Sequence, residues 1–253
     1  YGLGNFLHNV QGVRFLEAIE RKGVGWNLSL QVLDGILCHN GEVHNPALYP
    51  DKGKDFTRLE EDIKKVIENP NAPIWPMTIE GCTVRMADTI SYIGRDIEDA
   101  IRLGLIKRNE IPADCRRILG ETNGTIVYTL VEDLIAESLE KPSLSFSPEI
   151  AHALKRLKDF NQEFIYTNPK VKIQTSKLKL MFGLLFEKYH KNLKAGNDNS
   201  VIFREFLDGI SSQYRDNTPL AMIVRDFIAG MTDEYFLSQC QENLMPHILS
   251  GHY

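Results

Sequence analysis

The chain has 253 residues, of which 43% are hydrophobic and 25% charged, and its formal net charge is −5 at pH 7. This composition is typical of a folded globular protein, and the net negative charge excludes an affinity of the whole chain for nucleic acid. No apolar run approaches the roughly 20 residues that a membrane-spanning helix needs, and the chain does not start with a signal-peptide pattern. We therefore expect a cytoplasmic protein without a membrane partner.

The cysteines indicate the redox compartment of the chain, and the first residue bears on its position within the gene product. Four cysteines are scattered along the sequence without a CxxC pair, which predicts free thiols in a reducing compartment: Cys38, Cys82, Cys115 and Cys240. The first residue is Tyr1 and not Met. We expect a processed end or a start within a longer gene product.

Helical periodicity dominates the chain, and we predict an all-α fold. Only residues 124–131 have strand propensity, and their apolar and acidic continuation favours a helix there instead. The last predicted stretch can hold one helix or two. The predicted helices, in chain order, cover residues 9–23, 27–42, 59–69, 85–104, 122–141, 149–166, 175–192 and 219–245.

Local signals mark the ends of several of these helices. Gly23 ends the first, and Asn27 is the predicted N-cap of the second. Pro70 ends the helix before it, and Ser147 followed by Pro148 is typical of an N-cap with Pro in the first turn. Gly230 lies inside an apolar stretch, where a glycine costs about 1 kcal/mol relative to Ala, so we expect close packing there.

A polar stripe on the helix over residues 85–104 is the strongest candidate site. At about 100° per residue, four polar side chains fall within roughly 80° of one another: Asp88, Tyr92, Asp96 and Asp99. The opposite side is apolar and is expected to pack: Ile90, Ile93, Ile97, Ala100 and Ile101. The stripe is either a solvated face with charge pairs or a functional face. Short Asp side chains with a tyrosine in their middle favour a surface that holds a metal ion or a sugar hydroxyl.

The stretch RMADTISYIGRDIEDAIRLG resembles the second half of the catalytic core in deoxyguanosinetriphosphate triphosphohydrolases and related dNTPases of the HD superfamily. The segments NFLHNVQGVRFLEAI, GWNLSLQVLDGILCHNGE, SPEIAHALKRLKDFNQEFIYTNP and RDFIAGMTDEYF resemble further parts of these enzymes in the same order. The resemblance covers most of residues 5–240. It implies an incomplete HD-domain-like helical bundle, with residues 1–106 as the C-terminal part of the catalytic core and residues 107–253 as a helical region packing on it.

The resemblance implies hydrolysis of a deoxynucleoside triphosphate, dGTP-like, to deoxynucleoside and inorganic triphosphate. Asp88 matches the last ligand of a divalent metal, which can be Mg, Mn or another transition metal. Tyr92 would pack against the deoxyribose and exclude a 2′-hydroxyl, and Asp96 would accept a hydrogen bond from the 3′-hydroxyl. His8 resembles an active-site histidine that contacts the phosphates and donates a proton. Tyr235 would belong to the nucleobase end of the pocket.

One departure from the family's pattern limits these expectations. The sequence holds no His-Asp doublet, and the family's other metal ligands precede the region that matches. We therefore expect a C-terminal portion that is inactive alone, with the activity in the full-length protein. Two alternatives stay open: a different nucleotide phosphohydrolase on the same scaffold, and a non-catalytic nucleotide-binding or regulatory module.

Several other residues have two readings. Arg225, Asp226 and Asp233 close the nucleobase end together with Tyr235, or they only pack helices and pair at the surface. His39 and His44 suggest a metal by spacing, but a place for His39 at a helix C-terminus is favoured.

Two more short patterns also leave a choice. Asn123-Gly124 is predicted to form a turn. The basic stretches at residues 155–160 and 170–179 are solvated faces or contacts for a nucleotide effector or single-stranded DNA, and the resemblance implies a homo-oligomer.

Overall fold

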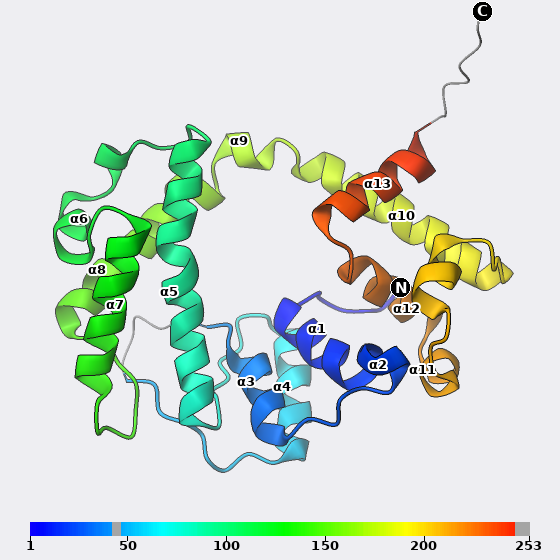
Figure 1. Cartoon of the computed structure of the whole chain (residues 1–253), viewed down its shortest axis with the longest axis horizontal. Helices are drawn as coiled ribbons and strands as arrows, with labels where there is room; N and C mark the ends of the chain where they lie inside the picture. Colours follow the sequence, from blue (N-terminus) through cyan, green and yellow to red (C-terminus); the bar gives the residue numbers. More distant parts are fainter. Residues whose placement is uncertain (42–46, 246–253) are drawn as a thin grey trace, which may run out of the picture. The chain divides into compact units, whose positions relative to one another are not determined.

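The computed structural model describes residues 1–41 and 47–245 (Figure 1). Within these residues the chain is built from helices, and the only β pairing is an isolated antiparallel bridge between Leu48 and Leu144. The predicted all-α fold is confirmed. None of the helices in the described part is long and apolar enough to cross a membrane.

The described chain forms two compact units. Unit 1 comprises Tyr1–Phe6, Gln11–Asn27 and the chain from Gln174 onward, and unit 2 comprises Leu7–Val10 and Leu28–Ile173. The predicted end of the catalytic core, between residues 106 and 107, lies inside unit 2. Compactness does not say where a catalytic core ends, so that assignment stays a prediction.

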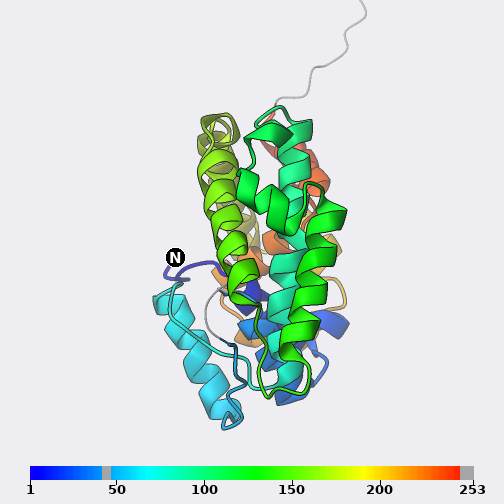
Figure 2. The ribbon, with the colours of Figure 1, turned by 90° about the vertical axis from the view of Figure 1, so that its left-hand side faces the viewer.

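Unit 2 contains the longest helix, α5, which crosses its centre. After α1 (His8–Arg14), which continues into unit 1, its elements are α3 (Leu30–Cys38), α4 (Phe56–Glu68), α5 (Ile79–Arg102), η2 (Arg108–Glu110), α6 (Ala113–Leu119), α7 (Asn123–Ser138), α8 (Pro148–Asn161), η3 (Gln162–Tyr166) and α9 (Pro169–Lys172). α5 packs against α3, α7, α8 and η3, and Figure 2 shows α5 and α7 side by side.

The apolar face of α5 forms the core of unit 2, as its periodicity predicts. Ile93 is 0% exposed and Ile97 is 1% exposed. The side chain of the buried Asn161 donates to the carbonyl of Ile93 at 3.1 Å, which joins α8 to α5. The helix begins earlier than predicted because Thr78 caps it: its Oγ1 accepts from the backbone N–H of Gly81 at 3.0 Å.

Two predictions about helix ends in unit 2 are wrong. Asn27 does not cap α3: it has a φ of 51°, in the left-handed region that Asn tolerates, and the N-cap is Ser29. Asn123-Gly124 forms no turn, because Thr122 forms a capping box with Thr125 and draws both residues into the first turn of α7. The predicted cap at Ser147, followed by Pro148 in the first turn of α8, is confirmed.

A buried charge cluster fixes the segment that leads into α5. The Nζ atom of Lys54 lies 2.7 Å from Asp34 Oδ1 and 2.8 Å from Asp62 Oδ2, and all three side chains are at most 3% exposed. The other oxygen of Asp34 accepts from the backbone N–H of Met77 at 2.6 Å. The cluster therefore ties α3 and α4 to the chain just before α5.

Unit 1 is a smaller helical packing with a core of its own. Its elements are η1 (Phe15–Ile19), α2 (Glu20–Gly23), α10 (Thr175–Ala195), η4 (Ile202–Leu207), α11 (Ser212–Asn217), α12 (Leu220–Ala229) and α13 (Asp233–Leu244). α10 packs against α12 and α13, with Leu185 and Val224 fully buried. The hydroxyl of the buried Tyr189 donates to Gln239 at 2.6 Å, which joins α10 to α13.

Two glycines in unit 1 have different roles. Gly23 ends the first helical stretch, as predicted, with a φ of 79°, and a Cβ there would lie 2.8 Å from the Cβ of Tyr214. Gly230 ends α12, so that α12 and α13 are separate helices. The close packing expected at Gly230 is wrong, because a Cβ added there would meet only two carbonyl oxygens at 3.6 Å.

All four cysteines are buried free thiols, as predicted. Burial raises the pKa of Cys38 to about 12, with the charge of Asp34 acting in the same direction. These thiols are therefore unreactive core residues.

Candidate functional site

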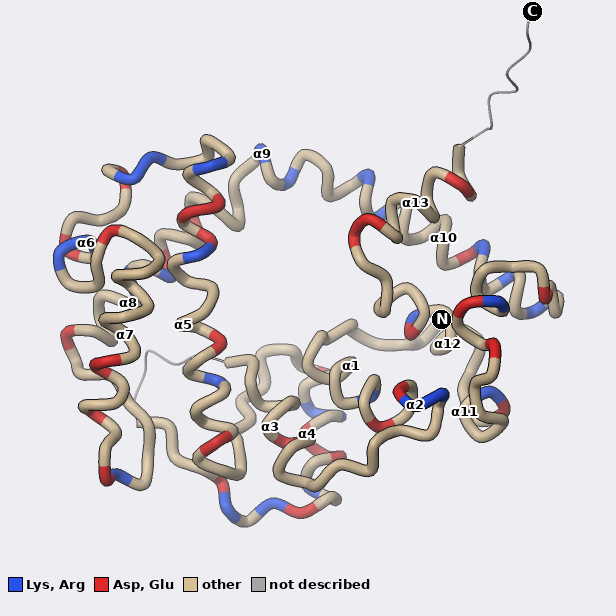
Figure 3. The backbone as a smooth tube through the Cα atoms, viewed as in Figure 1, with Lys and Arg blue, Asp and Glu red and all other residues tan. Residues whose placement is uncertain are grey.

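The polar stripe on α5 divides into two parts with different surroundings. Asp88, Tyr92 and Asp96 follow one another at four-residue intervals, and each is partly buried. Asp99 has a 44% exposed side chain and pairs with two arginines of the same helix, Arg95 at 3.5 Å and Arg102 at 3.0 Å. Figure 3 shows acidic and basic residues alternating along α5. The solvated reading therefore holds for Asp99, while the first three residues form a half-buried column.

Asp96 is held in place by a tyrosine that the sequence analysis did not single out. The hydroxyl of Tyr166, at the end of η3, donates to Asp96 Oδ2. Burial raises the pKa of Tyr166, and the hydrogen bond to Asp96 raises it further, so the hydroxyl stays protonated as a donor. Tyr166 is the last residue of a predicted helix, and nothing in the local pattern links it to a residue 70 positions earlier.

His8 is paired with a second histidine. Its Nε2 lies 3.0 Å from Nε2 of His39, and the Nδ1 of His39 lies 2.7 Å from the carbonyl oxygen of Ile36. A carbonyl only accepts, so His39 carries its proton on Nδ1 when neutral, and its Nε2 accepts from Nε2–H of His8. His39 is the C-cap of α3, as predicted, but its contact with His8 was missed. His44 lies outside the described residues.

The charge state of His8 follows from its neighbours. Partial burial lowers the pKa of His8, and the imidazole of His39 lowers it further, while the charge of Asp88 acts in the opposite direction. His8 is therefore close enough to Asp88 to sense its charge. The arrangement favours a neutral His8 whose single N–H, on Nε2, donates to His39 and whose Nδ1 remains an acceptor.

A cavity of about 640 Å³ borders the column on the side of Tyr92. Arg85 of α5 and Lys158 of α8 bring two cationic side chains to its wall, and Ile74 and Trp75 form part of its apolar wall. Arg85 also donates to the carbonyl of Ile74 at 2.8 Å. A cavity with two cations, one tyrosine ring and apolar walls fits an anionic ligand that carries a flat or cyclic body.

The described residues do not make up a metal site by themselves. In residues 1–41 and 47–245, no three His, Cys, Asp or Glu side chains lie together as ligands would. A stable divalent site needs at least three protein ligands or several oxygen donors. These side chains alone therefore do not fit a bound metal, and the role of Asp88 as a ligand stays a prediction.

The residues predicted at the nucleobase end lie in unit 1. Tyr235, on α13, donates its hydroxyl to Glu205 of η4, and burial raises the pKa of Tyr235. Asp226, on α12, is fully buried and accepts from Arg14 at 2.6 Å and from Tyr214 at 2.8 Å. For Asp226 these contacts are those of helix packing.

The basic stretch at residues 155–160 is paired with acids of unit 2. Lys155 lies 2.6 Å from Asp159, and Arg156 lies 2.7 Å from Asp114 of α6. These pairs are those of a solvated helix face.

The chain is similar to known proteins along most of its length. Residues 144–242 match the family model described as a phosphohydrolase-associated domain. A protein of Caldanaerobacter subterraneus subsp. tengcongensis named deoxyguanosinetriphosphate triphosphohydrolase-like protein is 32% identical over 96% of this chain and 59% of its own length. Proteins of the same name from Clostridium tetani and Clostridium perfringens (strain 13) are 32% and 29% identical over 96% of this chain and 61% of theirs.

The chain thus spans about 60% of the length of these relatives. The similarity covers 96% of this chain and so extends over both units. The resemblance to deoxyguanosinetriphosphate triphosphohydrolases found in the sequence is confirmed.

Proposed function

We propose that this protein is a phosphohydrolase of the HD superfamily that acts on deoxynucleoside triphosphates, dGTP among them, and releases deoxynucleoside and inorganic triphosphate. The observation that carries the proposal is the half-buried column of Asp88, Tyr92 and Asp96 beside a cavity with two cationic side chains. The names of the relatives support the same substrate class.

The column would recognise the sugar. The hydroxyl of Tyr166 donates to one oxygen of Asp96, and the remaining lone pairs of the carboxylate can accept from a 3′-hydroxyl. The ring of Tyr92, one helical turn before Asp96, would pack against the deoxyribose. A 2′-hydroxyl would then meet the ring, which disfavours ribonucleotides by steric exclusion.

The phosphates would lie near His8 and the two cations of the cavity. Arg85 and Lys158 offset the negative charge of the phosphates, and Nε2–H of His8 is oriented by its contact with His39. The Nε2–H of neutral His8 is donated to His39, so His8 would donate to a leaving alkoxide from Nδ1 once that nitrogen has taken up a proton. On the resemblance, we propose Asp88 as one ligand of a divalent metal, for which the described residues supply no complete set of ligands.

The test follows inorganic triphosphate by anion-exchange chromatography. The 253-residue chain and the full natural gene product are incubated with Mn²⁺ or Mg²⁺ and with each dNTP and rNTP. We expect triphosphate from dNTPs alone, lost in Asp88→Ala and retained in Asp99→Ala, a matched change on the exposed side of the same helix. We expect Tyr92→Ala to admit ribonucleotides.

Two outcomes would contradict the proposal in different ways. No triphosphate from the full gene product, together with thermal stabilisation by dNTPs, would favour the alternative of a nucleotide-binding module. Equal loss of activity in Asp88→Ala and Asp99→Ala would mean that α5 acts only through its fold.

A further inference from the structure

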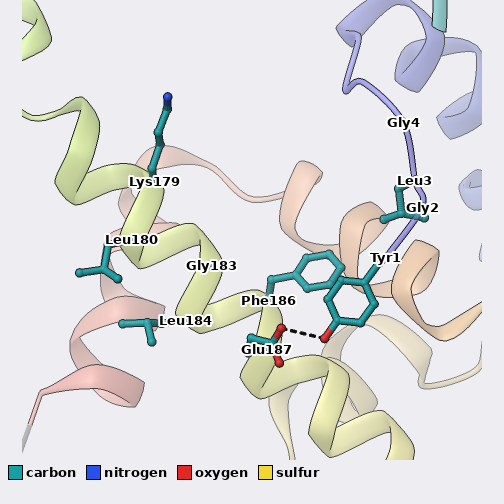
Figure 4. Close-up of a pocket in the computed structure, with 10 residues that line it drawn as sticks. All are labelled: Tyr1, Gly2, Leu3, Gly4, Lys179, Leu180, Gly183, Leu184, Phe186 and Glu187. Atoms are coloured by element: carbon teal, nitrogen blue, oxygen red, sulfur yellow. Dashed lines mark hydrogen bonds between the residues drawn. The ribbon is translucent and has the colours of Figure 1, made fainter. Parts of the chain in front are cut away.

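A second pocket lies in unit 1. It has a volume of about 450 Å³ and is lined by Phe6, by Phe182 and Phe186 of α10, and by Arg225 of α12. A neighbouring cavity of about 660 Å³ shares Phe186 and is shown in Figure 4. There the ring of Tyr1 lies next to Phe186, and its hydroxyl donates to Glu187 at 2.8 Å. The lining of the neighbouring cavity contains one cation, Lys179, and one acid, Glu187, whereas the lining of the first contains one cation and no acid.

Arg225 has an unusual environment. Its side chain is 19% exposed, and none of the described residues accepts a hydrogen bond from its guanidinium. The buried Nε is without a partner, and the nearest carboxylate oxygen, on Asp226, is 3.8 Å from Nη2. Of the five N–H donors of this guanidinium, the one on Nε is buried without an acceptor, which costs free energy, while the side chain as a whole keeps some access to solvent.

Asp226 does not balance this charge, because other donors already hold it. Gln11 donates to one of its oxygens at 2.9 Å, Arg14 contacts both oxygens at 2.9 and 3.0 Å, and Tyr214 donates at 2.8 Å. Burial lowers the pKa of Arg225, but an arginine keeps its charge at neutral pH, so Arg14 and Arg225 share the single carboxylate of Asp226 and the three side chains together carry one net positive charge.

We propose that this pocket binds a small aromatic monocarboxylate, with the carboxylate on the guanidinium of Arg225 and the ring among the phenylalanines. A carboxylate matches the planar fork of a guanidinium with two parallel hydrogen bonds. Phe182 and Phe186 offer ring faces and edges to a flat apolar body. A single net positive charge matches a monoanion and not a triphosphate, so this ligand differs in charge from the substrate proposed for unit 2.

The test compares naphthoate with the neutral isostere naphthamide by titration calorimetry and ligand fluorescence. We expect saturable binding of naphthoate, at least tenfold tighter than that of naphthamide. Arg225→Gln should remove this preference by weakening naphthoate binding at least tenfold. Arg204→Gln, at an exposed arginine of η4, should leave both affinities unchanged, and Phe182→Ala should weaken both ligands.

Three results would overturn the proposal. They are the absence of saturable naphthoate binding up to its solubility limit, equal affinities for the acid and the amide, and displacement of naphthoate by a dNTP in both the wild type and Asp88→Ala. If Arg225→Gln fails to fold, the comparison of acid and amide on the wild-type chain decides alone. None of these binding measurements needs hydrolytic activity. A failure of this proposal can therefore be told apart from a failure of the function proposed for unit 2.

Discussion

Asp226 in unit 1 and Asp96 in unit 2 both accept a hydrogen bond from a tyrosine hydroxyl, yet their surroundings differ. Asp226 is fully buried and is also bound by Gln11 and Arg14. Asp96 is partly exposed, and among the described residues Tyr166 alone donates to it. A carboxylate whose lone pairs are all occupied stabilises the fold, whereas one that is oriented and still open can bind a ligand.

The acids of the buried cluster around Lys54 resemble Asp226, because their oxygens are also hydrogen-bonded within the chain. Asp34 accepts from Lys54 and from the backbone of Met77, and Asp62 also faces Lys54. These acids are satisfied from within the chain. Acidic side chains of this protein therefore divide by how many donors the fold already supplies, and this count separates the proposed site from the supports of the fold.

The largest loss of stability is expected when an acid whose oxygens are all hydrogen-bonded within the fold is removed. Asp226→Ala leaves the guanidinium of Arg14 without its partner, and breaking a buried ion pair from one side costs about 3–5 kcal/mol. Urea denaturation should show this loss in the free energy of unfolding. Asp216→Ala, at an exposed acid of α11, is the control and should change stability by less than about 0.5 kcal/mol. A loss below about 1 kcal/mol in Asp226→Ala would remove the distinction between the two kinds of acid.

The open acid should behave in the opposite way. Asp96→Ala is expected to lower triphosphate release from dNTPs by about 100-fold, which corresponds to about 2.7 kcal/mol, because the sugar loses its acceptor. The free energy of unfolding should change by less than about 1 kcal/mol, since Asp96 is partly exposed. Steady-state kinetics and denaturation on the same preparations test both statements. A large loss of stability in Asp96→Ala would mean that Asp96, like Asp226, stabilises the fold.

Tyr166→Phe tests whether the orientation of Asp96 by the Tyr166 hydroxyl affects substrate binding. Removing the hydroxyl frees Asp96 to rotate, and we expect about a tenfold rise in KM for dNTPs with a smaller change in kcat. Tyr128→Phe is a matched control, because Tyr128 is an exposed tyrosine of α7 whose hydroxyl also donates to an acid, Glu132. Equal kinetics in the two variants would show that Asp96 needs no support from η3.

Much of the fold could be predicted because it depends on local periodicity. Ile90, Ile93 and Ile97 recur at three- and four-residue intervals along α5, as one face of a helix requires, and they are buried. The errors lie at helix ends, where one side chain decides between two local arrangements. Thr122 draws Asn123 and Gly124 into α7, although this pair by itself favours a turn.

The candidate site could be predicted only where it lies on one helix. Asp88, Tyr92 and Asp96 share a face of α5, so their spacing alone indicated a column. His39 and Tyr166 were missed because they reach the site through tertiary packing, 31 residues from His8 and 70 residues from Asp96. The lack of a hydrogen-bond acceptor for Arg225 could likewise not be predicted from the sequence, because it depends on which donors bind Asp226.

The smallest expected effect concerns His8 and the pH dependence of stability. The pKa of His8 is lowered in the folded chain, so between the ordinary value near 6.5 and the lowered value the unfolded chain binds more protons than the folded chain. Stability should therefore fall as the pH falls through this window. His8→Gln keeps a donor for His39 but cannot titrate, so its stability should fall less between pH 7 and pH 5. His152→Gln, at an exposed position of α8, should follow the wild type. Thermal denaturation across this range measures the difference, and parallel curves for His8→Gln and the wild type would mean that the histidine pair is not held in its neutral form.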